Sequence, residues 1–365
     1  MTTLCKFCNS ANRNSFTEGD CFLCEGKFGK MDSLIEKAAE KIAPDSSFSI
    51  STVIPKKWLE REERLWDSRL EGCESIKTYA NRHAGRALGK KTGARPDTDG
   101  DVRIVFDIEK GEVTAEPNDL FIFGRYEKLV AGISQSRWKC TECNGKGCKK
   151  CEGKGKMYES VEEKIGEVMK GETGAGDYSM HASGREDIDV VTTAGRPFVM
   201  QMAAAKSRKP DLGKIAKGIA EGKEVAVSDL KIVKRGAVEL VAASHFDKEY
   251  EAEVEFEKEP GKEQVDAILS LGGKTIEQLT PERVAHRRAI LTRRRKILRI
   301  KLISSKGKKA AFRIETEAGT YIKELITGDN ERTRPSFSSI LGMKAGCVSL
   351  KVVKIEDGFL RETME

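Results

Sequence analysis

Residues 181–190 read HASGREDIDV, and the interpretation of the whole chain starts from them. The stretch places Asp187 and Asp189 directly after a Gly-Arg pair, with a further acid at Glu186. Three interpretations are open: a catalytic carboxylate, a metal site or a charged loop. A calcium site would need more oxygen ligands, and no calcium-loop spacing follows. A carboxylate can serve as nucleophile or base without a cofactor, so an aspartate is the expected reactive group if the protein is an enzyme.

Other catalytic signatures are absent from the sequence. No GxSxG elbow, P-loop or GxGxxG turn leading into a helix occurs. The four histidines, His83, His181, His245 and His286, are scattered and indicate no cysteine–histidine nucleophile pair. These absences leave the acidic stretch as the candidate reactive site.

Length and composition indicate a soluble chain of two domains. The protein has 365 residues, of which 38% are hydrophobic and 34% charged, which is enough for two separate cores. No apolar run reaches the roughly 18 residues that a membrane helix needs. The N-terminus lacks the apolar core of a signal peptide. We therefore expect a cytoplasmic protein without a membrane partner.

Positive charge is concentrated in one segment. The formal net charge is only +7, but every charged residue between positions 283 and 309 is basic. Such a segment is typical of a protein that binds a polyanion. The alternative is a solvated basic face, which would usually carry interleaved acids. The charge pattern thus favours a nucleic-acid partner.

The cysteines predict metal rather than disulfides. The chain has ten cysteines, and eight of them form CxxC pairs. Two neighbouring pairs can close a tetrahedral thiolate site around zinc and leave no open coordination position, so such sites are structural. We expect one or two zinc ions, the alternative being reduced cysteines without metal. The predicted ligands are Cys5, Cys8, Cys21 and Cys24 in one cluster and Cys140, Cys143, Cys148 and Cys151 in the other.

The first part of the chain alternates helices and strands as in a small α+β module. We expect the zinc-binding ribbon and this module to form one domain over residues 1–135, followed by the second cysteine segment over 136–156. The module resembles a THUMP domain, an RNA-binding unit of tRNA-modifying enzymes. Helices are expected over 31–44, 57–71 and 75–91, and strands over 48–54, 101–108 and 121–130.

The remaining residues, 157–365, are rich in strands and predict a mostly antiparallel mixed sheet that carries a few helices. A glycine-rich loop is expected over 170–179, leading into the acidic stretch. Strands are expected over 197–203, 223–233, 248–258, 297–304, 310–318 and 347–355, and helices over 211–222, 262–271 and 321–328.

Several motifs in this second part resemble one enzyme family. Residues 184–187 (GRED) are similar to the GRxD motif of pseudouridine synthases, whose aspartate is catalytic. The longer string over 181–199 resembles the archaeal and eukaryotic tRNA pseudouridine synthases that carry an N-terminal zinc-binding THUMP region. Further similar segments follow in the family's order: KEY at 248–250, TPERVAHRR at 280–288, GTYIKEL at 319–325, and GD with RTRPS within 328–336.

The resemblance implies a role for each matching residue. Asp187 would act as nucleophile or base at the sugar, and the sequence does not choose between these. Arg185 would help to extrude the uridine, and Tyr250 would stack on the flipped base. Lys323 would lie beside Asp187 and keep it ionised, since a nearby opposite charge lowers a carboxylate pKa. Leu325 and Ile322 would line the apolar wall of the pocket.

The resemblance also implies the substrate: uridine at position 54 or 55, or both, in the T-loop of tRNA. No catalytic cofactor and no protein partner are implied. Arg283, Arg287 and Arg288 would contact the RNA backbone. One departure stands out, because residues 191–194 read VTTA where many members have RMLG. The alternative functions are a zinc-containing tRNA-binding protein without catalysis, or a different THUMP enzyme, whose cofactor or ATP motif is missing here.

Overall fold

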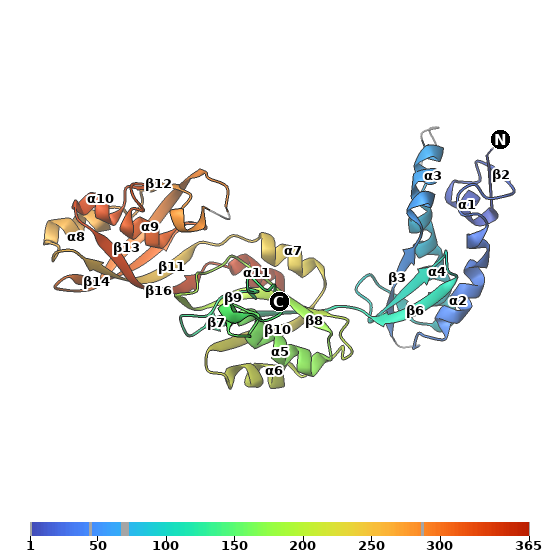
Figure 1. Cartoon of the computed structure of the whole chain (residues 1–365), viewed down its shortest axis with the longest axis horizontal. Helices are drawn as coiled ribbons and strands as arrows, with labels where there is room; N and C mark the ends of the chain where they lie inside the picture. The colour runs from blue at the N-terminus through green and yellow to red at the C-terminus, as the bar shows by residue number, and fades with distance from the viewer. Residues whose placement is uncertain (1, 44–45, 67–72, 286–287, 365) are drawn as a thin grey trace. The chain divides into compact units, whose positions relative to one another are not determined.

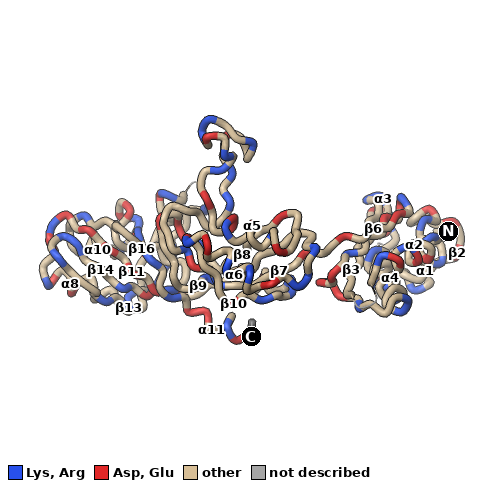
Figure 2. The backbone as a smooth tube through the Cα atoms, turned by 90° about the horizontal axis from the view of Figure 1, so that it is seen from below, with Lys and Arg blue, Asp and Glu red and all other residues tan. Residues whose placement is uncertain are grey.

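The computed structural model describes residues 2–43, 46–66, 73–285 and 288–364. Within them the chain forms two compact units, each with its own hydrophobic core. Figure 2 shows Lys and Arg spread along both units with Asp and Glu between them. The first unit comprises Met1–Leu120, Thr173–Asp177 and Ala203–Arg208, and the second comprises Phe121–Glu172, Tyr178–Met202 and Lys209–Glu365.

A four-stranded sheet of order β4-β3-β5-β6 is the framework of the first unit. The helix α4, the longest among the residues that the structure describes, packs on β3 and buries Ala80, Ala84 and Leu88, whose spacing of four residues places them on one face. The Ser75 hydroxyl caps this helix by accepting a hydrogen bond from the Thr78 N–H at 3.1 Å. The elements are β1 (Thr3–Leu4), α1 (Lys6–Ala11), β2 (Thr17–Glu18), η1 (Lys27–Lys30), α2 (Met31–Ala39), β3 (Ser47–Val53), α3 (Lys56–Trp66), α4 (Ile76–Thr92), β4 (Arg95–Pro96), β5 (Val102–Asp107) and β6 (Glu112–Pro117).

A ten-stranded sheet organises the second unit, in the order β10-β7-β9-β16-β11-β14-β13-β12-β15 with β8 paired to β9 (Figure 1). The central strand β11 is antiparallel to both β14 and β16, whereas β16 and β9 are parallel. This agrees with the mostly antiparallel mixed sheet that the sequence predicts. The strands are β7 (Leu120–Lys128), β8 (Asp177–Ala182), β9 (Val190–Ala203), β10 (Val225–Val233), β11 (Lys248–Phe256), β12 (Thr275–Leu279), β13 (Thr292–Lys306), β14 (Lys309–Thr316), β15 (Thr333–Arg334) and β16 (Ala345–Ile355).

Helices cover this sheet at several points. α6 packs against β10, α8 against β13 and α9 against β16, while α10 contacts both α8 and α9. The contacts of α10 and β16 with α9 hold that helix in place, and α9 carries part of the candidate site. The helices are η2 (Lys149–Cys151), α5 (Val161–Thr173), α6 (Leu212–Ala220), α7 (Gly236–Ala243), α8 (Lys262–Leu269), η3 (Glu282–Val284), α9 (Ile322–Thr327), α10 (Phe337–Leu341) and α11 (Gly358–Met364).

Two elements differ from the prediction: one strand pairs in another sheet, and one loop is shorter. The strand over 121–130 forms as β7, but it pairs with β10 in the large sheet and not with the first module. Its apolar run predicts a buried strand without specifying the sheet. The loop over 170–179 is shorter than expected, because α5 continues to Thr173 and β8 begins at Asp177. Of its glycines, Gly174 has the positive φ, +62°, of the bend between them.

The second cysteine segment leaves the fold and returns to it. An antiparallel bridge between Lys139 and Lys156 closes its base. Gly147 has a φ of +90°, and a Cβ there would lie 2.7 Å from the carbonyl oxygen of Gly153. Glycine is therefore required where the two halves of the segment meet, as the alternation of cysteine and glycine in the sequence suggests.

Candidate active site

The acidic stretch forms the connection between β8 and β9. Gly184 begins its turn with a φ of +73°. A Cβ at this position would lie 3.2 Å from Nη1 of Arg196 and 3.9 Å from Nζ of Lys248. The glycine thus allows two cationic side chains to approach the backbone directly beneath the turn.

Glu186 faces the interior and anchors the turn. Its carboxylate accepts hydrogen bonds from the Tyr126 hydroxyl at 2.9 Å and forms an ion pair with Nε of Arg196 at 2.8 Å. Both charged side chains are only 1% exposed. Gln135 donates to the Gly184 carbonyl at 2.9 Å and to the Tyr126 oxygen at 2.8 Å. Burial and the Glu186 carboxylate raise the pKa of Tyr126 well above its usual value, so the phenol stays a donor.

A buried lysine holds the backbone on the other side of the turn. Nζ of Lys128 donates to the carbonyl oxygens of Asp187 at 2.9 Å, Ile188 at 3.1 Å and Ile133 at 3.0 Å. Three acceptors match the three N–H groups of an ammonium. With Glu186 and Lys128 fixed, the backbone that carries the Asp187 side chain has little freedom to move.

Asp187 lies between two cations. Its Oδ2 is 2.8 Å from Nη1 of Arg283 and 3.7 Å from Nζ of Lys323. Lys323 lies closer to Asp189, at 2.6 Å from both carboxylate oxygens. Burial alone would raise the pKa of Asp189, but the Lys323 ammonium outweighs burial and holds that pKa below its usual value. Arg283, expected on the RNA backbone, is therefore the nearer charge partner of Asp187, and Lys323 chiefly binds Asp189.

Arg283 is itself fixed by a second acid. Its Nε donates to the Glu324 carboxylate at 2.6 Å, and Glu324 is buried on α9. Burial alone would lower the pKa of Arg283, but Glu324 and Asp187 raise it well above its usual value. The arginine therefore bridges α9 and the acidic turn as a permanent cation.

Tyr250 and Lys248 lie two residues apart on β11 and both line the cavity above the turn. Burial raises the pKa of Tyr250 to about 12, so its phenol is neutral near pH 7. Burial and the neighbouring Arg196 lower the pKa of Lys248 to about 8. Nζ of Lys248 donates to the Phe246 carbonyl at 2.7 Å and keeps further N–H groups for the cavity.

These side chains surround a cavity of about 370 Å³. This volume lies in the range of pockets that hold small organic ligands. Apolar contacts come from Val190, Leu350 and Val352. Of the residues that the sequence predicted, the cavity brings together Arg185, Asp187, Tyr250, Arg283, Arg288, Ile322 and Lys323.

The remaining predicted residues of the site are Leu325 and Arg287. Leu325 is fully buried in the hydrophobic core, one helical turn beyond Ile322 on α9, and is not among the residues that line the cavity. Its contribution to the pocket wall stays a prediction. Arg287 lies outside the residues that the structure describes.

Other cations of the cavity have no acid beside them. Arg293 donates to the Thr280 hydroxyl at 2.9 Å, and Arg295 donates to the Arg294 carbonyl at 2.9 Å. Within the described part of the chain, neither these two nor Arg185 or Arg288 forms an ion pair with a carboxylate, whereas Lys248 has Asp247 as its neighbour. This side of the cavity is left with uncompensated positive charge.

The sequence interpretation missed the residues that hold the site together. Arg196 stands in the quoted string over 181–199 and Glu186 inside GRED, but neither was given a partner. Tyr126 and Gln135 lie 60 and 51 residues before Glu186, and no local pattern links them to it. A usable signal was the charge of Arg196 inside an otherwise uncharged and mostly buried strand, because a buried charge needs a partner.

The two cysteine clusters have the geometry of thiolate sites. Within each, the four sulfurs lie within 4.8 Å of one another. Sγ–Sγ distances are 3.6 Å for Cys5 and Cys24 and 3.7 Å for Cys140 and Cys148. A tetrahedral zinc with bonds of about 2.3 Å separates its sulfurs by about 3.8 Å, so the residues fit this ion. The N–H of Gly155 donates to the Cys151 sulfur at 3.2 Å, and such backbone hydrogen bonds orient and stabilise thiolate ligands.

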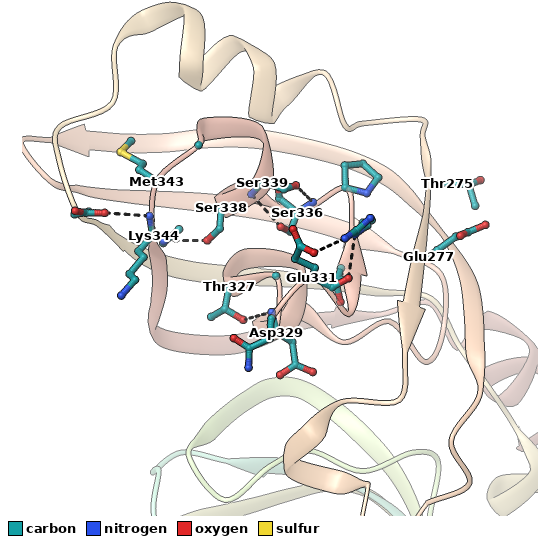
Figure 3. Close-up of a pocket in the computed structure, with 18 of the residues that line it drawn as sticks. Thr275, Glu277, Thr327, Asp329, Glu331, Ser336, Ser338, Ser339, Met343 and Lys344 are labelled. Atoms are coloured by element: carbon teal, nitrogen blue, oxygen red, sulfur yellow. Dashed lines mark hydrogen bonds and ion pairs between the residues drawn. The ribbon is translucent and has the colours of Figure 1, made fainter.

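Two further observations concern the molecule at large. Among the helices that the structure describes, none is both long enough and apolar enough to cross a bilayer. A second, larger hollow of about 1210 Å³ lies beside α10 and the turn after α9, with mixed acidic, basic and hydroxyl side chains in its lining (Figure 3).

Comparison with known proteins gives consistent matches. The family described as "Pus10, C-terminal" matches residues 121–356, and "Pus10 THUMP domain, archaeal" matches 34–107. The tRNA pseudouridine synthase Pus10 of Archaeoglobus fulgidus is 35% identical over 96% of this chain and 99% of that protein. The protein of the same name from Methanocaldococcus jannaschii is 39% identical, covering 94% and 77%. A solved Cbf5-Nop10-Gar1 complex is 18% identical over 64% of this chain and 50% of that chain, with a TM-score of 0.36, too low to carry an argument.

Proposed function

The chain belongs to the Pus10 family of tRNA pseudouridine synthases, and on this premise we propose that it isomerises T-loop uridine with Asp187 as the catalytic carboxylate. As a member of this family, the protein is an isomerase that converts uridine in tRNA to pseudouridine. One observation carries the assignment of Asp187: of the two GRED carboxylates that line the cavity, Glu186 is buried in its pair with Arg196, whereas Asp187 is partly exposed between Arg283 and Lys323.

The geometry supports a division of roles in the cavity. The reaction breaks the C1′–N1 bond, joins C1′ to C5 and releases the C5 proton, while N1 takes up a proton. Asp187, whose charge is stabilised by Arg283, would serve as nucleophile or base at the sugar. Tyr250, neutral because its pKa is raised to about 12, would stack on the flipped base. Arg185 is exposed at the rim of the cavity and would fill the gap that the extruded base leaves.

Phosphate binding is best assigned to the cations without acidic partners. Arg288, Arg293 and Arg295 line the cavity without a carboxylate nearby in the described part of the chain, so their charge is available to the RNA backbone. Arg283 is engaged by Asp187 and Glu324, and we place it in the catalytic group. The THUMP module would grip the tRNA by shape and phosphates. The contacts of the cavity arginines and of the THUMP module with the tRNA would together determine whether position 54 or position 55 is modified.

Each cysteine cluster would hold one structural zinc ion. The donor set of four thiolates leaves no site for substrate, so the metal would cross-link loops and take no part in the reaction. Metal analysis of the purified protein should find two zinc ions per chain. A content well below two would contradict this assignment.

The catalytic assignment is tested with a T-loop tRNA transcript that is tritiated at uridine C5. Wild-type protein should release tritium to water, whereas Asp187→Ala should release none and still bind tRNA. Asp189→Asn is the matched variant, since it removes a neighbouring carboxylate, and should lose far less activity. Full tritium release by Asp187→Ala would contradict the assignment. A wild-type protein that binds tRNA and releases no tritium would favour a tRNA-binding role without catalysis.

A further inference from the structure

The turn that follows α9 has an unusual backbone. Gly328, Asp329, Asn330 and Glu331 have φ values of +83°, +46°, +52° and +66°. Residues with side chains rarely adopt positive φ, and three in succession persist only where the surroundings impose them. Hydrogen bonds from Arg332 N–H to the Asp329 carbonyl and from Thr333 N–H to the Gly328 carbonyl, both 3.1 Å, close the turn.

The turn contacts residues 279–282, which lead into η3, through several hydrogen bonds. Oδ2 of Asp329 accepts a hydrogen bond from the Glu282 N–H at 3.1 Å. The Arg332 guanidinium donates to the Thr280 carbonyl at 3.2 and 3.0 Å, and its Nε lies 3.7 Å from Oδ2 of Asp329. The N–H of Leu279 donates to the Arg332 carbonyl at 2.8 Å. Residues 279–282 are thus fastened to the turn along their whole length.

The next residue of the fastened segment is Arg283. Its guanidinium contacts Asp187 at 2.8 Å and Glu324 at 2.6 Å. Glu324 also accepts, through its backbone carbonyl, the N–H of Gly328 at 2.8 Å. The turn therefore connects α9, which supplies Glu324, to the segment that supplies Arg283.

We propose that Asp329 is a positioning residue that fixes the backbone of Arg283 so that its guanidinium meets Asp187. The inference rests on the proposed function, because it concerns the same carboxylate. Asp329 does not line the catalytic cavity and acts only through the Glu282 N–H and Arg332. Glu331, in the same turn, pairs instead with Arg334 (Figure 3). The two acids of the turn therefore have separable roles.

The test combines four variants of the full-length protein in the tritium-release assay. Asp329→Ala should lower kcat about 10-fold and leave KM for tRNA unchanged, since a displacement of about 1 Å at a reacting group has effects of this order or larger. Asp329→Asn keeps an acceptor for the Glu282 N–H and should recover part of the activity. Glu331→Gln is the matched control and should match wild type. Arg283→Ala serves for a double-mutant cycle with Asp329→Ala.

If Asp329 acts through Arg283, the double variant should be no slower than Arg283→Ala alone. Independent, multiplicative losses would overturn the proposal, as would a wild-type kcat for Asp329→Ala. Should Asp329→Ala fail to fold, Asp329→Asn carries the same cycle, because its own smaller loss must likewise vanish in the Arg283→Ala background. Inactive wild-type protein would contradict the proposed function itself. Active wild type with independent losses would overturn only the role of Asp329.

Discussion

Two parts of the cavity wall differ in how their cations are compensated. In the compensated wall, formed by the acidic turn, β9, η3 and α9, Arg196, Arg283 and Lys323 each lie beside a carboxylate. In the uncompensated wall, formed by β13, Arg293 and Arg295 contact only hydroxyl and carbonyl oxygens within the described part of the chain. The difference indicates that the compensated wall positions the reactive carboxylate before RNA binds, whereas the charge of the uncompensated wall is available to RNA phosphates.

The largest effect should come from the compensated wall. Arg283→Ala should lower kcat by about 100-fold with little change in KM, because it removes the nearest charge partner that orients Asp187, and a misplacement of about 1 Å at a reacting group can cost about 10²-fold in rate. Arg283→Lys keeps the positive charge but lacks the planar guanidinium, so its kcat should lie between those of wild type and Arg283→Ala. Single-turnover tritium release measures these rates. An unchanged kcat with a raised KM would instead place Arg283 among the RNA-binding arginines.

The uncompensated wall should govern affinity. Replacing Arg293 and Arg295 together by alanine should weaken tRNA binding about 10-fold at low salt and reduce the salt slope of log K by about 1–2, because fewer phosphate contacts remain. Filter binding over a range of salt concentrations measures both. Arg294→Ala is the matched control, since Arg294 alternates to the other face of β13 and is 75% exposed. An equal loss for Arg294→Ala would mean that the wall has no special role.

The smallest effect concerns stability. Lys248 has a pKa of about 8 in the folded protein and 10.5 as an ordinary lysine, so between these values the unfolded chain binds one more proton. The free energy of unfolding should therefore rise with pH over this window through Lys248. Lys248→Met should be more stable than wild type at pH 7, with an advantage that shrinks toward pH 10. Urea unfolding at several pH values tests this, with Lys306→Met as the exposed control, and a constant difference would contradict it.

Local motifs predicted which residues meet at the cavity, because Asp187, Tyr250 and Lys323 each stand in a short ordered string. Partners across the sheet were not predictable in the same way. The pairing of Arg283 with Asp187 depends on β12, η3 and the turn after α9 being folded against one another. The depth of Leu325 in the core was not predictable either, because spacing on a helix gives the face of a residue and not its burial. The strand β7 was assigned to the wrong sheet for the same reason, since an apolar run reports burial without naming its neighbours.

The pair of Glu186 and Arg196 has a consequence for how this sequence can vary. Each charge is buried, so losing one partner would leave the other unpaired at a loss of about 3–5 kcal/mol, whereas replacing both by apolar residues is often tolerated. Positions 186 and 196 should therefore either covary or both be conserved among relatives. Glu186 in GRED and Arg196, ten residues downstream, would then be conserved as a pair. A sequence motif restricted to the four GRED residues would contain only one member of that pair.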